Sequence, residues 1–160
     1  WTHIVLQEQS RLPRANYEWF RASVHNWVDY IRRNCPNPDV QIILTMNWAY
    51  NNDFDKYSLQ NEILDRNCLA LAQECGITLV PVGLGNQDHF EQGGAALANK
   101  LHNDECHPSF RGTYMASCME YAVIFNESPL GIKFNSPKLT PEACKEVREC
   151  VKRVLDKFVQ

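Results

Sequence analysis

An acidic residue and a histidine lie three positions apart in the segment LHNDECHPS, residues 101–109. In a turn, the carboxylate of Asp104 can hold one imidazole nitrogen of His107 while the other nitrogen faces outward. A general-base histidine in acyl transfer is oriented in this way. The bare Asp-x-x-His spacing is, however, more typical of a solvated loop or of a cap on the helix that follows. The segment therefore indicates catalysis only if other parts of the chain support it.

The same segment offers two other kinds of chemistry. His102, Asp104, Cys106 and His107 are all metal-ligand types, but four neighbours on one short loop rarely converge tetrahedrally without a second ligand segment. Cys106 stands next to His107, yet adjacent side chains in an extended turn generally diverge, which argues against a Cys-His nucleophile pair. We predict neither a metal nor an organic cofactor.

Composition narrows the class of protein. The 160 residues, 44% of them hydrophobic, fit one domain with an adequate core. The formal net charge is -3 and the basic residues are scattered, so we expect no nucleic-acid partner. No apolar run reaches the roughly 18 residues of a membrane span, and we expect no membrane partner. A small-molecule or carbohydrate ligand remains, and the oligomeric state stays open.

The cysteines leave two interpretations. There are seven, Cys35, Cys68, Cys75, Cys106, Cys118, Cys144 and Cys150, so pairing within the chain cannot be complete. Buried thiols that act as small hydrophobic side chains are at least as good an explanation as disulfides. No Cys-x-x-Cys pair occurs, which gives no support to a zinc ribbon or a thioredoxin-like site.

Strand and helix patterns alternate along the first half of the chain. Short β-branched runs at 3–9, 40–46 and 77–83 predict buried strands, and helical spacing of apolar residues predicts helices over 16–34 and 57–75. Two more helices are expected at 110–125 and 140–159, the last one opened by Thr140 and Pro141. The alternation predicts an α/β domain with a parallel sheet and right-handed crossovers.

Ligands of open parallel sheets bind beyond the carboxyl ends of the strands. The expected ends here read QEQS, NWAYNN and GLGNQDHF, residues 7–10, 47–52 and 83–90. Amide and aromatic side chains suit a hydroxylated substrate better than a phosphate. The Gly-Leu-Gly at 83–85 lacks a third glycine and a clear following helix, so it is a weak dinucleotide motif.

The block DECHPSFRGTYMASCMEYAVIF, residues 104–125, resembles the carboxy-terminal block of the SGNH (GDSL-like) hydrolases, in which Asp-x-x-His-Pro-Ser precedes a helix. WTHIVLQEQS and ILTMNWAY resemble strand ends of a carbohydrate-esterase-like branch of uncharacterised function in that superfamily. The likeness covers most of the chain in order. It implies a flavodoxin-like, three-layer α/β/α sandwich over residues 1–160.

The resemblance also implies roles for individual residues. His107 would be the general base and Asp104 its orienting partner. Gln9 stands where many relatives carry an asparagine that donates to the oxyanion, and its longer amide offers the same N–H donor. Trp48 would line the substrate pocket, although a buried core tryptophan is an equally good interpretation.

The nucleophile of the family is missing from its usual place. Relatives carry a serine in a Gly-Asp-Ser or Gly-Asn-Ser block after their first strand, and this sequence contains neither. Ser10 alone directly follows an expected strand, but it lacks the glycine of a tight nucleophile turn. We interpret the chain as starting at the family's third strand, with a signal peptide or earlier strands removed; a removed signal peptide would make the protein secreted. Residues 3–9 would then form an unpaired apolar edge that promotes oligomers or poor solubility.

The expected function is ester hydrolysis by two-step acyl transfer, with a carbohydrate as the acylated substrate. The parent protein would be active, and the chain without the serine would be inactive. Two alternatives stay open. One is a non-catalytic glycan-binding module on the same fold, and the other is a complete enzyme that uses Ser10, Asp104 and His107.

Overall fold

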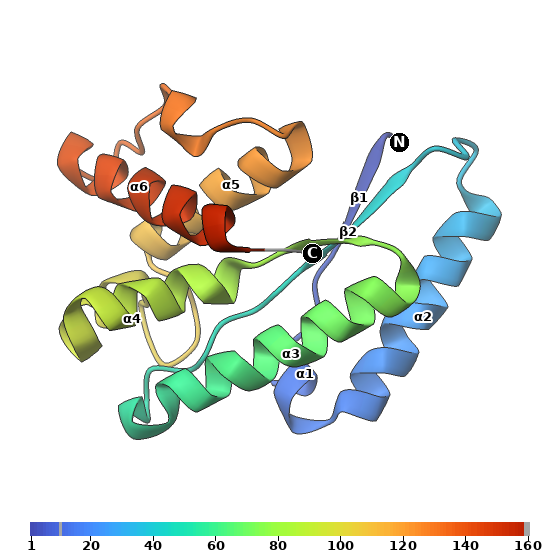
Figure 1. Ribbon diagram of the computed structural model, residues 1–160, viewed down its shortest axis with the longest axis horizontal. Helices are drawn as coiled ribbons and strands as arrows, with labels where there is room; N and C mark the ends of the chain where they lie inside the picture. Colours follow the sequence, from blue (N-terminus) through green and yellow to red (C-terminus); the bar gives the residue numbers. More distant parts are fainter. Residues whose placement is uncertain (10, 159–160) are drawn as a thin grey trace.

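The computed structural model describes residues 1–9 and 11–158 and shows an α/β domain (Figure 1). Ser10 and residues 159–160 lie outside the described part. The strands are β1 (His3–Leu6), β2 (Gln41–Thr45) and β3 (Thr78–Val80). The helices are α1 (Leu12–Ala15), α2 (Tyr17–Asn34), α3 (Tyr57–Cys75), α4 (Val82–Ala98), α5 (Phe110–Phe125) and α6 (Pro141–Lys157), with short 3-10 turns η1 (Phe54–Lys56), η2 (Asn99–Leu101) and η3 (Pro129–Gly131).

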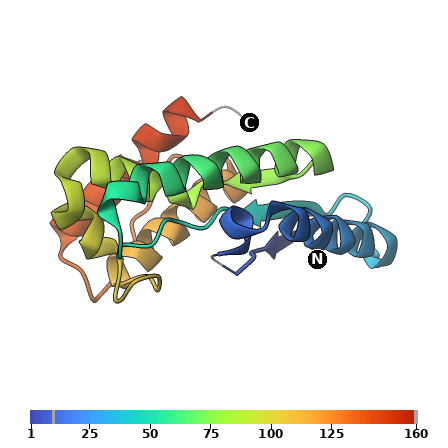
Figure 2. The ribbon, with the colours of Figure 1, turned by 90° about the horizontal axis from the view of Figure 1, so that it is seen from below.

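The three strands form one parallel sheet in the order β1-β2-β3. The predicted alternation of strands and helices, and the parallel pairing, are confirmed. Successive side chains of β2 enter two different cores because neighbours on a strand point to opposite faces. Ile42 and Leu44 join the core under α2 and α3, whereas Ile43 joins the core under α5 and α6. Figures 1 and 2 show these two helix pairs on opposite sides of the strands, which gives three layers.

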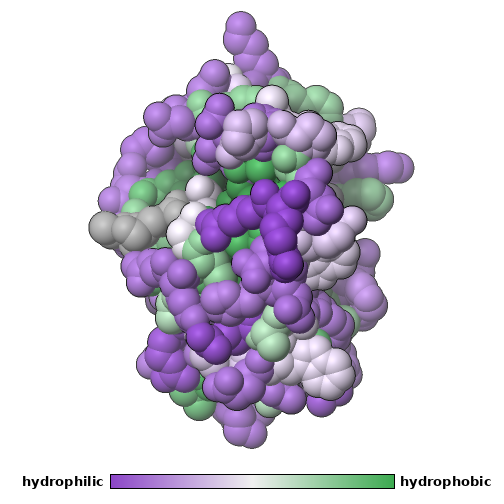
Figure 3. All heavy atoms as spheres, turned by 90° about the vertical axis from the view of Figure 1, so that its right-hand side faces the viewer, coloured by the Kyte–Doolittle hydropathy of each residue, from purple (hydrophilic) through white to green (hydrophobic). Residues whose placement is uncertain are grey.

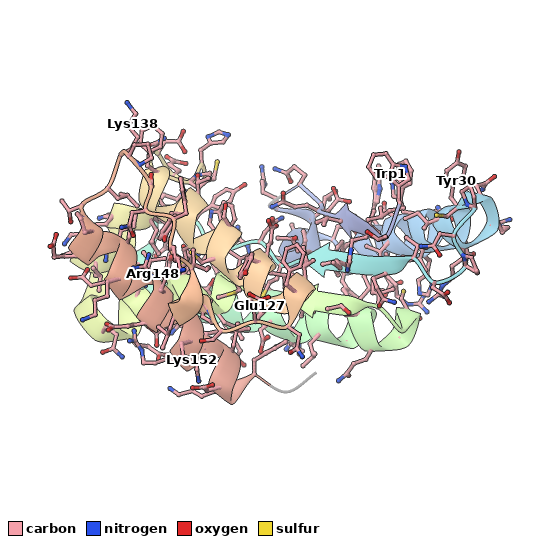
Figure 4. The ribbon with its side chains drawn as sticks, turned by 90° about the horizontal axis from the view of Figure 1, so that it is seen from above. Trp1, Tyr30, Glu127, Lys138, Arg148 and Lys152 are labelled. Carbon is pink, nitrogen blue, oxygen red and sulfur yellow. The ribbon has the colours of Figure 1, made fainter. Side chains whose placement is uncertain are left out.

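The strand β1 is less well covered than β2. Four of the five β2 residues are buried, as expected for a parallel strand with helices on both faces. In β1, Val5 pairs with the buried Ile43 and points to the same face, yet it is 45% exposed. Within the described residues, the other edge of β1 has no strand beside it. Trp1 and Tyr30 project from the same end of the molecule (Figure 4).

The helix ends agree with the sequence signals. The side chain of Thr140 accepts a hydrogen bond from the backbone of Ala143 and caps α6, with Pro141 in the first turn. Gly76 ends α3 in the left-handed conformation at φ 59°, where glycine has no steric penalty. The expected helix over 16–34 is α2, which begins at Tyr17 because Asn16 caps it.

The prediction for residues 77–90 was wrong in part. The strand ends at Val80, and the stretch GLGNQDHF is the beginning of α4, not a strand end that opens into a pocket. Gly83 allows this helix to start close against the end of β2, since a Cβ there would lie 2.3 Å from the carbonyl oxygen of Asn47. The glycine therefore serves helix-strand packing, and the segment carries no phosphate loop. The short helix α1 was also not predicted.

All seven cysteines are free thiols, and five of them are buried. The buried-thiol interpretation therefore fits the structure. No helix in the described ranges is both long and apolar enough to cross a membrane. The face at the amino ends of the strands is largely hydrophilic, with apolar side chains in a recess (Figure 3).

Candidate functional site

The segment between η2 and α5 is a tightly held loop. Ser109 begins α5: its side chain accepts from the backbone N–H groups of Arg111 and Gly112 and donates to the carbonyl of Lys100 at 2.6 Å. The backbone of Asn103 donates to His107, and Ser109 donates to Leu101. A Cβ on Gly112 would lie 2.2 Å from the Leu101 carbonyl oxygen, so only glycine lets the helix and the loop approach this closely. The loop is therefore fixed at both of its ends.

Asp104 and His107 form the pair that the spacing predicted. Asp104 Oδ2 lies 2.8 Å from His107 Nδ1. The other carboxylate oxygen, Oδ1, accepts from the backbone N–H of Cys106 at 2.9 Å and of His107 at 2.8 Å. The side chains are 55% and 75% exposed, so a substrate in solvent can reach the imidazole. With Nδ1 held by the carboxylate, Nε2 is the nitrogen available to take a proton.

Backbone hydrogen bonds to the carboxylate determine the protonation of Asp104. Donation by His107 and Cys106 from the backbone, and then by the His107 side chain, lowers the pKa of Asp104 well below its usual range. Asp104 is therefore ionised at neutral pH. An ionised carboxylate at Nδ1 stabilises an imidazolium, which is the electrostatic condition for a histidine that accepts a proton during the reaction.

Cys106 does not behave as a nucleophile. Its Sγ lies 3.7 Å from His107 Nδ1, so the two adjacent side chains do not diverge as expected. However, Asp104 already occupies that nitrogen. Burial, followed by the charge of Asp104, raises the pKa of the Cys106 thiol, which favours the unreactive protonated form.

The four-residue metal set does not converge. One potential ligand atom from each of Asp104, Cys106 and His107 lies within 4.8 Å of the others. His102 instead points into the protein, where it is 8% exposed and its Nε2 lies 3.3 Å from the hydroxyl of Tyr57. Both oxygens of Asp104 are engaged in hydrogen bonds to the loop. The arrangement serves the histidine better than it would serve a metal ion.

Trp48 connects the sheet to this loop. Its Nε1 donates to the carbonyl oxygen of Cys106 at 2.8 Å, and its ring packs half-buried against the core formed by α5 and α6. The ring therefore packs against the core and its N–H positions the loop, while its place in a substrate pocket stays a prediction. The neighbouring backbone of Asn51 donates to Glu105 and adds a second attachment.

Asn47, which precedes Trp48, joins the end of β1 to the same edge. Its side chain accepts from Gln7 Nε2 at 2.8 Å and donates to the carbonyl of Glu8 at 2.7 Å. Sequence reasoning missed Asn47; its place directly after a predicted buried strand was the one available signal. Gln9, the residue after Glu8, is exposed. Its side-chain oxygen accepts a hydrogen bond from the backbone N–H of Arg11 at 2.9 Å. Ser10 lies outside the described residues.

A separate apolar hollow of about 600 Å³ runs along the side of α5, between that helix and residues 131–136. It starts at Phe110, three residues beyond His107, but neither Asp104 nor His107 lines it. Figure 4 places Lys138 and Arg148 at this α5-α6 end of the molecule. The hollow is therefore distinct from the edge where the acid-histidine pair stands.

The fold resembles that of a known bacterial protein. The chain superposes on a DUF4886 family protein from Bacteroides uniformis with a TM-score of 0.84 at 19% sequence identity. The match covers 98% of this chain and 63% of that one, so the chain spans less than two thirds of that protein's length. No family model and no curated protein matches the sequence. At this identity the similarity shows the α/β fold, without an activity.

Proposed function

We propose that this chain is part of a serine ester hydrolase of the SGNH type that acts on acylated carbohydrate. The main support is the Asp104-His107 pair, joined at 2.8 Å and exposed beside the carboxyl edge of a parallel sheet. Ligand sites of open α/β folds lie at this edge. The resemblance of residues 104–125 to the histidine block of the SGNH hydrolases includes this pair and extends the support to the Pro-Ser and the helix that follow it.

The proposed reaction has two steps. His107 Nε2 takes the proton of a serine hydroxyl as that oxygen attacks the ester carbonyl. The tetrahedral intermediate then breaks its bond to the sugar oxygen, which receives this proton from the imidazolium and leaves as the alcohol. Water then attacks the acyl-serine by the same route and releases the carboxylic acid. Asp104 stabilises the imidazolium in both steps. Gln9 is the proposed donor to the oxyanion through its amide N–H.

We propose that the nucleophile is a serine outside residues 1–160. Within the described part of the chain, no serine hydroxyl is hydrogen-bonded to His107, and Ser109 is engaged with Lys100 and with the start of α5. Ser10 is the alternative nucleophile within the chain. A serine from either source would have to reach Nε2 of His107.

The lack of a serine hydroxyl bonded to His107 among the described residues also favours a second candidate function. A glycan-binding module could keep the amide and aromatic residues of the carboxyl edge without a serine at His107. Such a protein would bind acetylated sugars and would not turn them over.

The test is hydrolysis of acetylated oligosaccharides by the full chain as its gene encodes it. We expect that His107→Ala lowers kcat/KM by at least about 10³-fold. His25→Ala is the control, because His25 is a partly exposed histidine of α2 that bonds to Glu74 and lies outside the candidate site. Binding of the sugar without turnover in the unaltered protein would replace the esterase proposal by the binding module.

A further inference from the structure

A hollow of about 740 Å³ lies directly beside the loop of Asp104 and His107. Glu105, the residue between Asp104 and Cys106, is part of its wall, and so is Tyr50, two residues beyond Trp48. The remaining wall comes from Arg11 and α1, from the segment 52–56 that includes η1, and from the beginning of α3. Asp104 and His107 do not line this hollow, but Glu105 joins it to the loop that carries both of them.

Two arginines line this side of the hollow: Arg11, which directly precedes α1, and Arg14 within α1. Neither forms an ion pair within the described residues, whereas Arg21, Arg111 and Arg153 each bind a carboxylate. The Arg14 guanidinium lies over the ring of Tyr50, 5.3 Å from its centroid, and its Nε is buried without a hydrogen-bond partner. The buried Nε is closed to a ligand, but Arg14 as a whole is only half-buried and lines the hollow, so its guanidinium can donate to an acceptor placed there.

The position of α1 is fixed by contacts with its neighbour. Asn67 of α3 donates to the carbonyl of Pro13 at 2.8 Å, and α1 lies beside α3 in Figure 1. The arginines therefore stand on an anchored turn and not on a loose chain end.

The other charges of the hollow largely cancel. Lys56 bonds to Asp53 at 2.9 Å. Glu105 is the remaining carboxylate; its Oε2 accepts from Asn52 at 3.2 Å. With Lys56 and Asp53 set aside, two guanidinium groups face one carboxylate, which leaves the hollow net positive.

We propose that this hollow binds the anionic group of an acidic carbohydrate, with Arg14 and Arg11 as its ligands. This inference rests on the proposed function and narrows it: the substrate would be an acylated sugar that carries a carboxylate or a sulfate. A guanidinium offers paired N–H donors that match both oxyanions. The volume accommodates a sugar ring beside the charged group, within the range of small-molecule sites.

The first test measures binding without turnover. Methyl glucuronoside, methyl glucoside and methyl glucoside 6-sulfate are titrated by calorimetry into the full chain. We expect one or both anionic sugars to bind at least about tenfold tighter than the neutral one, with the preference weakening as salt rises. The tighter anion identifies the source of the negative charge. Equal affinity for the neutral and both anionic sugars would overturn the inference.

Matched variants locate the binding. Arg14→Gln is expected to lower the affinity for the anionic sugar at least about tenfold and to leave methyl glucoside binding unchanged. Arg66→Gln removes an exposed arginine of α3 that is not part of the hollow and should change neither affinity. Glu105→Gln should strengthen anion binding. Unchanged anion affinity in an Arg14→Gln variant that circular dichroism shows to be fully folded would contradict the assignment.

The failure of this inference and the failure of the esterase proposal look different. Anion binding that depends on Arg14, together with no ester turnover, would leave the anion site standing and remove the esterase. Turnover of neutral and acidic sugar esters at equal kcat/KM would keep the esterase and remove the anion site.

Discussion

Two clusters in this protein contain the same three residue types and have opposite properties. Asp104, Cys106 and His107 are gathered on an exposed loop, and Asp88, His89 and Cys150 are gathered inside the protein, each set with its ligand atoms within 4.8 Å. In the loop, the carboxylate bonds to the imidazole. In the interior, the Asp88 carboxylate bonds to Arg153 at 2.6 Å, and Nδ1 of His89 has no partner in the described structure.

The difference shows that partners and exposure determine what an Asp-His-Cys group can do. Burial, followed by the charge of Arg111, lowers the pKa of His89 to about 4. A histidine with that pKa stays neutral at physiological pH, and substrate cannot reach it at 3% exposure. His107 is open to solvent beside an ionised Asp104. We therefore expect the interior cluster to contribute to stability, and we propose that the chemistry takes place at the loop cluster.

The largest expected effect is on activity, from Asp104→Asn. Asparagine keeps an oxygen for the backbone of Cys106 and His107 but offers an amide to His107 Nδ1, which would favour the wrong tautomer. We expect kcat/KM to fall by about 10³-fold to 10⁴-fold while the urea midpoint changes little. Activity near that of the unaltered protein would mean that the two clusters do not differ in the way described.

The second expected effect is a pH dependence of stability that comes from His89. Its pKa is about 4 in the folded protein and 6.5 when unperturbed, so the unfolded chain binds more protons between these values. The stabilisation is present above about pH 6.5 and is lost as the pH falls toward 4, with a size of roughly 3 kcal/mol. Urea unfolding from pH 7 to pH 4.5 measures it, and His89→Gln should flatten the curve whereas His107→Gln should not.

A smaller loss of stability is expected from Asp88→Asn. Burial raises the pKa of Asp88, but hydrogen bonds from Arg153 and Cys150 and the charge of Arg153 outweigh burial and leave that pKa lowered. Removing the carboxylate charge leaves Arg153 without its partner and should cost about 2 kcal/mol of unfolding free energy. Asp156→Asn, which loses an exposed pair with Lys152, should cost less than about 0.5 kcal/mol. Catalytic activity per folded molecule should be the same in both variants.

The smallest expected effect is that of Trp48→Phe, which keeps an aromatic ring but loses the N–H that donates to Cys106. We expect a stability loss of about 1 kcal/mol and a fall in kcat with little change in KM, because the loop is positioned less firmly. A change in KM alone would indicate that Trp48 contacts substrate instead.

The sequence predicted what depends on local signals. Thr140 and Pro141 identified the start of α6 and the β-branched runs identified the strands, because capping and alternation act over a few residues. Asp104 and His107 were found because they belong to one short loop with a recognisable order. The expected bond between their side chains is present. The structure also shows two backbone N–H groups that donate to Asp104 and favour its ionised form, which the sequence did not predict.

Other features depend on contacts between distant segments, and no local signal carried them. The sequence showed Gly83 only as part of a weak dinucleotide motif, because its role depends on the close approach of Asn47. The interior cluster unites α4, which was not predicted as a helix, with α6, 65 positions away. Arg14 and Tyr50 come together through the packing of α1 against α3. Such pairings follow from the tertiary fold.

The most direct test of the central claim is labelling of the gene-encoded full chain with a fluorophosphonate probe, which reacts with activated serines, followed by mass-spectrometric mapping of the labelled peptide. We predict one labelled serine, outside residues 1–160 or at Ser10, whose labelling is lost in His107→Ala and Asp104→Asn and kept in His25→Ala. No labelling of the unaltered protein, or labelling that persists in folded His107→Ala, would contradict the assignment of His107 as the base of a serine hydrolase.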